Sequence, residues 1–149
     1  MNLKIKNYEL ETFAYMLYEM KLGTKKSRMR TRLFKVLQNH LNDLQEANEA
    51  LIEEYAIHDE NGDLLRNSEN QYKLDELTAD EYFKELDILR NEENVIEINE
   101  ATQDMILTVA KSFLEEDVAL NKNEATIYDD ICEQLEEIIT HYEFIETAE

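Results

Sequence analysis

Apolar residues recur every three or four positions along most of this 149-residue chain. That period predicts a protein built mainly of α-helices. The longest run begins near Ser27 and continues to about Tyr55, and at ~1.5 Å per residue it would form a rod of roughly 40 Å. We expect this helix to be the spine of the domain. Its apolar stripe comprises Met29, Leu33, Val36, Leu37, Leu41, Leu44, Ala47, Leu51 and Tyr55.

Shorter runs of the same period predict four more helices. The first begins near Tyr8 and ends before Gly23. Another follows Thr78, which opens a capping-box sequence, and a further one follows Asn99, a residue type that caps helices. The last helix begins near Glu124.

The last helix carries apolar residues at alternating four- and three-residue steps, a seam that packs lengthwise on another helix. We expect it to lie antiparallel along the spine helix. A dimer seam is the alternative, because further apolar residues widen this face beyond one partner. The seam residues are Ile131, Leu135, Ile138, Tyr142 and Ile145.

Short β-prone segments occur at residues 3–5, 64–65, 72–74 and 95–98. Asn61-Gly62 is a tight-turn sequence that predicts a hairpin near the second and third of these. We therefore expect one domain over residues 1–149, with a predominantly α, α+β fold. It would be a helical bundle around one long helix, with all four segments in a small antiparallel sheet.

Charge divides the chain into two unlike parts. The formal net charge is −20, yet residues 22–37 contain no acid and six of the 15 Lys and Arg residues. Residues 1–43 hold 9 bases and 4 acids, whereas residues 44–149 hold 6 bases and 31 acids. A surface this acidic disfavours nucleic acid and anionic membranes and favours basic partners.

The basic stretch surrounds the start of the spine helix, where the helix dipole disfavours cations. One explanation is internal neutralisation of Arg28, Arg32 and Lys35 by acids of the last helix. The alternative is a contact site for phosphate, RNA or an acidic protein surface. The residues of this candidate site are Lys25, Lys26, Arg28, Arg30, Arg32 and Lys35.

Rows of glutamates on the spine and on the last helix lie away from the predicted apolar stripes. Helices hold such charges in fixed rows, so we expect them to bind a host or phage protein with a basic surface. A homodimer is a further expectation. The candidate residues are Glu46, Glu49, Glu53, Glu133, Glu136, Glu137 and Glu143.

The sequence shows no enzyme signature, and we expect no catalytic residue, metal or cofactor. The histidines His40, His58 and His141 lie far apart and form no zinc-binding pair. Cys132 has no Lys, Arg or His within one helical turn to lower its pKa, so a buried, inert thiol is expected. No segment approaches the ~20 apolar residues of a membrane span. We expect a cytoplasmic protein.

Three segments carry a family resemblance: SRMRTR, EEYAIHDENGDLL and EENVIEIN. Together they make the chain similar to a family of small phage and prophage proteins of unknown function from Gram-positive bacteria. The resemblance implies a viral origin and action in the bacterial cytoplasm, and it brings no catalytic residues.

These observations favour a small acidic protein without enzymatic activity that acts by protein–protein interaction. One form of that action is inhibition of a host nucleic-acid-handling protein by DNA mimicry. Two alternatives stay open. One is a virion assembly or structural accessory protein, and the other is a small nucleic-acid binder that uses the basic stretch.

Overall fold

A computed structural model describes residues 1–148, and for residues 147 and 148 the backbone alone. The predicted fold class is confirmed, because helices dominate and one small antiparallel sheet accompanies them. The elements are β1 (Asn2–Lys6), α1 (Asn7–Glu19), α2 (Thr24–Tyr55), α3 (Ala79–Asn91), β2 (Glu93–Glu97), α4 (Gln103–Leu114) and α5 (Lys122–Ala148).

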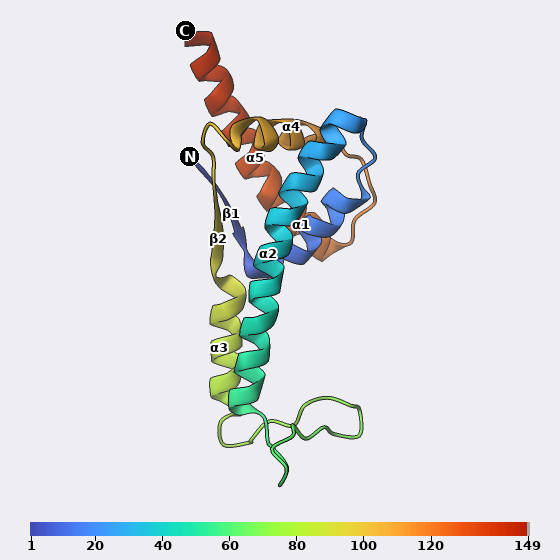
Figure 1. The fold of residues 1–149 in the computed structure, drawn as a ribbon, viewed down its shortest axis with the longest axis vertical. Helices are drawn as coiled ribbons and strands as arrows, with labels where there is room; N and C mark the ends of the chain where they lie inside the picture. The colour runs from blue at the N-terminus through green and yellow to red at the C-terminus, as the bar shows by residue number, and fades with distance from the viewer. Residues whose placement is uncertain (149) are drawn as a thin grey trace.

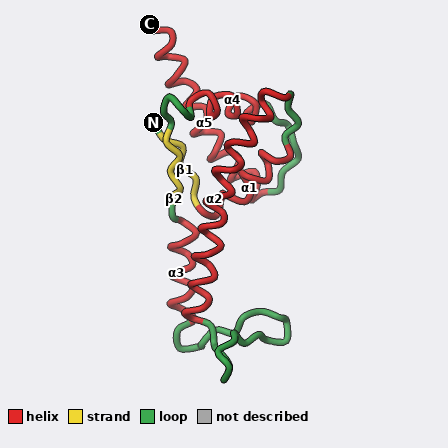
Figure 2. The backbone as a smooth tube through the Cα atoms, viewed as in Figure 1, coloured by secondary structure: helices red, strands yellow, loops and turns green. Residues whose placement is uncertain are grey.

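The molecule has a helical head and a two-helix stalk that projects from it (Figure 1). The long helix α2 belongs to both parts, since its first half packs on α1 and α4 and its second half on α3. Residues 56–78 form the loop that closes the far end of the stalk, which we call the tip (Figure 2). The N-terminus lies at the head, and α5 runs out of the head on the side away from the stalk (Figure 1).

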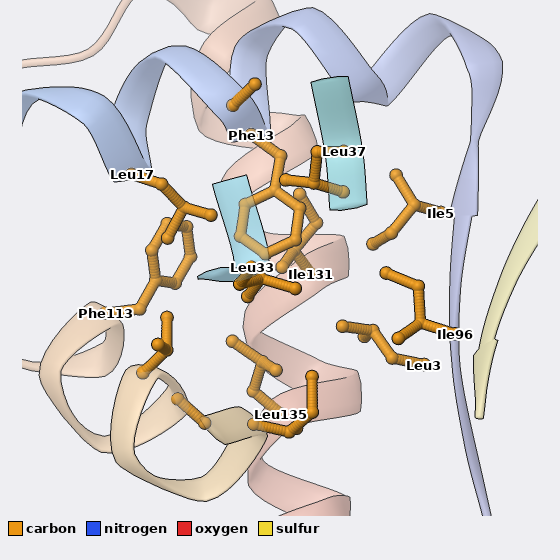
Figure 3. Close-up of a cluster of buried hydrophobic side chains, with 14 of the residues drawn as sticks. Leu3, Ile5, Phe13, Leu17, Leu33, Leu37, Ile96, Phe113, Ile131 and Leu135 are labelled. Atoms are coloured by element: carbon orange, nitrogen blue, oxygen red, sulfur yellow. The ribbon is translucent and has the colours of Figure 1, made fainter. Parts of the chain in front are cut away.

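The core lies in the head, where β1, α1, α2, α4 and α5 converge (Figure 3). Phe13 and Phe113 meet edge to face at its centre, with ring centroids 5.2 Å apart. This arrangement suits the quadrupoles of the two rings. The largest fully buried side chains are Phe13, Phe113, Leu3, Ile5, Leu10, Leu17, Leu33, Leu37, Ile106, Ile131, Leu135 and Ile138.

The stalk has no comparable core. None of the described side chains of α3 is buried, although Tyr82, Leu86 and Leu89 are half-buried against α2. The rings of Tyr55 and Tyr82 meet edge to face near the tip at 5.9 Å. Two helices alone can shield only one side of each other, so the stalk depends on a narrow seam.

The sheet consists of β1 and β2 in antiparallel register, with Leu3 opposite Ile96. The second edge of β1 is covered by a side chain from α5. Gln134 accepts a hydrogen bond from the Lys4 N–H at 2.9 Å and donates one to the Lys4 carbonyl at 2.7 Å. An unpaired sheet edge can pair with a strand of another chain. The Gln134 amide instead occupies the edge of β1 at Lys4.

The prediction of one four-segment sheet is wrong. Residues 64–65 and 72–74 lie in the tip, where isolated bridges join His58 to Leu64 and Arg66 to Tyr72. The predicted turn at Gly62 is present, with φ +84°, which favours glycine. The error came from the stalk, because α3 separates the tip from β2 by its whole length.

The helix starts differ from expectation at two caps. The Thr78 side chain makes no capping hydrogen bond, so the predicted capping box is absent from the start of α3. Asn99 instead accepts hydrogen bonds from the Ala101 and Thr102 N–H groups, one turn before α4 begins. Thr78 ends a turn, whereas Asn99 begins the turn that joins β2 to α4, so Asn99 caps that turn rather than the helix.

The prediction that the last helix packs along the spine is also wrong. Helix α5 packs mainly on α4 and also contacts α1 and β1. Its seam residues Ile131, Leu135 and Ile138 are buried in the head, whereas Ile145 is 41% exposed. The seam therefore serves the head core over its first half and then extends beyond it (Figure 1).

Candidate interaction surfaces

Arg30 has a structural partner, the C-terminal end of α1. Its Nη1 donates to the Leu17 and Met20 carbonyl oxygens, each at 2.6 Å, and to the Tyr18 oxygen at 3.2 Å. These carbonyls are the groups that a helix end leaves without partners. The last turn of α1 contains no basic residue, so α2 provides the cation that the negative pole of α1 favours.

The other members of the basic stretch are exposed: Lys25, Lys26, Arg28, Arg32 and Lys35. None of them forms an ion pair with a described side chain. The ion pairs among the described residues are His58 with Glu53 at 2.8 Å and Lys111 with Glu143 at 3.7 Å. The expectation of neutralisation by α5 is therefore wrong, because α5 packs on α4 rather than beside this part of α2.

The candidate glutamates form two separate surfaces. Glu46, Glu49 and Glu53 are exposed on the stalk half of α2. The second group is exposed on α5, which runs through the head and away from the tip (Figure 1). We call this second group the α5 acidic row, and its members are Glu133, Glu136, Glu137 and Glu143.

Most of these carboxylates face water, and among the described residues no cation lies beside them. Glu53 lies beside His58 in the tip. Glu143 has Lys111 at 3.7 Å, with both side chains more than half exposed. The field of the remaining carboxylates is therefore directed outward, where it can attract a basic partner.

A pocket of 250 Å³ lies in the head between α1, the loop after α4 and the start of α5, and both apolar residues and glutamates line it. Tyr15, Met20 and Val118 contribute to its lining, and Tyr128 closes one side. The Tyr128 hydroxyl donates to the Phe113 carbonyl oxygen at 2.8 Å. Burial raises the pKa of this hydroxyl, so the phenol stays protonated and serves as a structural donor.

The histidines and the cysteine lie in ordinary structural settings. His40 is half-buried on α2, and His141 contacts the Tyr142 ring at 5.0 Å. Cys132 is buried, and burial raises the pKa of its thiol, which keeps the thiolate from forming. Within the described part of the chain, no three His, Cys, Asp or Glu side chains gather where they could hold a metal ion.

None of the described helices combines the length and the apolar composition needed to cross a bilayer.

Fold and surfaces together define a helical head-and-stalk protein with a polarised charge distribution. The chain belongs to a family described as protein of unknown function, DUF1617, which matches residues 1–141. Neither a curated protein nor a solved structure matches the chain. Nothing in the sequence pointed to the contact of Gln134 with Lys4, whereas the lack of a base at the end of α1 was the available signal for the partner of Arg30.

Proposed function

We propose that this protein has no enzymatic activity and works by binding another protein, with the α5 acidic row meeting a basic surface. The observation that carries the proposal is the absence of paired cations beside Glu133, Glu136 and Glu137 among the described residues. These carboxylates project from a helix whose opposite side is anchored in the core. A fixed, unpaired row of this kind speeds the approach of a basic partner and orients it.

We further propose that the protein is of phage type and acts in the cytoplasm of a bacterial host, in keeping with its sequence resemblance. DNA mimicry would require two carboxylate ridges at a groove-like separation. The stalk glutamates and the α5 acidic row lie on different parts of the molecule, which weakens that form of inhibition (Figure 1). Direct binding of a basic protein does not depend on such ridges.

A role in assembly is the second candidate. An assembly factor needs exposed contact surfaces, and the stalk projects two helices and a tip away from the core. Leu77 is 92% exposed and Phe83 57% exposed there. Contiguous exposed apolar surface marks protein contact sites, and an assembly partner on the stalk would cover both side chains.

Affinity capture tests the proposed binding surface. The parent protein and the variant Glu133→Lys/Glu136→Lys/Glu137→Lys are immobilised and exposed to bacterial lysate, and retained proteins are identified by mass spectrometry. We expect the parent to retain a basic protein that the variant loses.

A matched control separates the α5 acidic row from net charge. The variant Glu60→Lys/Glu69→Lys/Glu76→Lys changes the charge by the same amount at exposed positions of the tip. It should retain the partner. Equal loss with both variants would show that net charge alone attracts the protein, and the proposed site would then be wrong.

A further inference from the structure

Eight exposed side chains form a line along α2 on the side away from the core. Successive members are alternately four and three residues apart, a spacing that keeps side chains on one side of a helix. At ~100° per residue, the buried Leu33 and Leu37 fall roughly opposite this line. We call it the α2 stripe, and its members are Arg28, Arg32, Lys35, Asn39, Asn42, Glu46, Glu49 and Glu53.

The order of the side chains is regular along the stripe: three bases, two amides and three acids. The bases make no ion pair with the described residues. At the acidic end, Glu49 accepts a hydrogen bond from Gln45 at 3.2 Å, and Glu53 contacts His58 at 2.8 Å. These contacts are exposed, so a charged partner can compete for both carboxylates.

The stripe is complementary to itself when it is reversed. Its midpoint falls between His40 and Leu41, and a second copy in antiparallel orientation aligns every base with an acid. Each contact then occurs twice, as it must across a two-fold axis. The facing pairs are Arg28 with Glu53, Arg32 with Glu49, Lys35 with Glu46, and Asn39 with Asn42.

We propose that the α2 stripe is an interface for a second copy of this chain, joined antiparallel about a two-fold axis. A nucleic acid would match the basic third of the stripe and be repelled by the acidic third. A basic protein would meet the reverse conflict. An antiparallel copy of α2 places opposite charges against both the basic and the acidic third of the stripe. In the head, α2 passes in front of α4 and α5 (Figure 1).

The net charge of the protein opposes dimerisation, so the dimer should depend on the salt concentration. Each copy carries −20, so two copies repel one another at long range. At 0.15 M salt the screening length is about 8 Å, which weakens that repulsion while contact pairs persist. One helix on another covers less than the ~1,200 Å² of standard interfaces, so the dimer should exchange rapidly.

Charge-set variants test the interface by sedimentation equilibrium at 0.15 M salt. The first variant is Arg28→Glu/Arg32→Glu/Lys35→Glu, and the second is Glu46→Lys/Glu49→Lys/Glu53→Lys. Each should dimerise at least about tenfold more weakly than the parent, because like charges then face each other. An equimolar mixture of the two should recover a one-to-one dimer.

The variant with all six substitutions is the matched control. It keeps the parent net charge, and each of its acids again faces a base in an antiparallel pair. It should dimerise like the parent. Circular dichroism checks that α2 stays helical, and the first variant is favoured in this respect because glutamates suit a helix N-terminus. A monomeric parent, or dimerisation that none of the variants alters, would overturn the proposal.

Discussion

Arg30 does for α1 what a basic residue in its own last turn would otherwise do. The contact joins two consecutive helices and ties the C-terminal end of α1 to the start of α2. The dipole of α2 disfavours bases at its start, and for Arg30 the carbonyls of α1 offset that cost. Arg30 is therefore a structural residue, whereas the exposed bases beside it can contact a partner.

Replacing Arg30 by alanine should destabilise the protein by about 2 kcal/mol, because partly buried hydrogen bonds from a charged donor to the carbonyls at the end of α1 are lost. For a chain of this length the melting temperature should fall by roughly 4–8 °C. Arg32→Ala removes an equal charge from an exposed position and should change stability by less than about 0.5 kcal/mol. Equal melting temperatures for the two variants would contradict the capping role.

Glu9 is a carboxylate held inside the protein, with only 4% of its surface exposed. It accepts a hydrogen bond from the Lys6 N–H at 2.9 Å. Burial nevertheless raises the pKa of this carboxyl, and Asp130 adds to the effect. Its charged form therefore opposes folding near neutral pH, and its protonated form does not.

Glu9→Gln should stabilise the protein near pH 7, because the amide keeps an acceptor oxygen and carries no charge. The advantage should shrink as the pH falls through the raised pKa and vanish below the ordinary carboxyl pKa, where Glu9 is protonated in both states. Melting temperatures of both proteins across pH 4–8 measure this difference. A constant difference across that range would contradict it.

Among the helices and strands, the apolar period predicted where each helix lies in the sequence. It did not predict which elements pack against one another. The spine helix was expected from Ser27 to Tyr55 and lies at Thr24–Tyr55. The seam of α5 was recognised, but such a seam fits α4 as well as α2, and nothing in its spacing selects between them. Likewise, β1 pairs with a strand some ninety residues away, and local pattern carries no record of that pairing.

The candidate surfaces also divide into features that local sequence predicts and features that depend on the folded chain. Exposure of the candidate bases and glutamates follows from their positions off the apolar stripe. Their separation into stalk and α5 groups follows from how α5 docks, which requires the folded chain. Gln134 is the clearest case, since its role depends on lying beside Lys4 across 130 positions of sequence.

The stalk should open at lower free energy than the head. Its helices share a half-buried seam, whereas α4 is buried at Ile106, Val109 and Phe113. Local opening free energies follow such differences in burial. Amides of α3 should therefore exchange with solvent at least about tenfold faster than those of α4 in native-state hydrogen exchange. If both helices exchange through the same global opening, the stalk is more firmly held than its packing indicates.

In the whole molecule, the net charge of −20 averages over surfaces of opposite sign. The head presents exposed bases on α2 and an acidic row on α5, and the stalk adds further carboxylates. A surface built for solubility alone would mix the signs. The segregation instead suits two kinds of contact, one with a copy of the chain and one with a basic partner.

We expect the α5 acidic row to guide a basic protein onto this molecule. The most direct test is the association rate with the captured partner, measured from 0.05 to 0.5 M salt for the parent and for Glu133→Lys/Glu136→Lys/Glu137→Lys. The parent rate should fall steeply with salt, and the variant should bind more slowly with a shallower dependence. A variant that associates as fast as the parent at every salt concentration would contradict the claim.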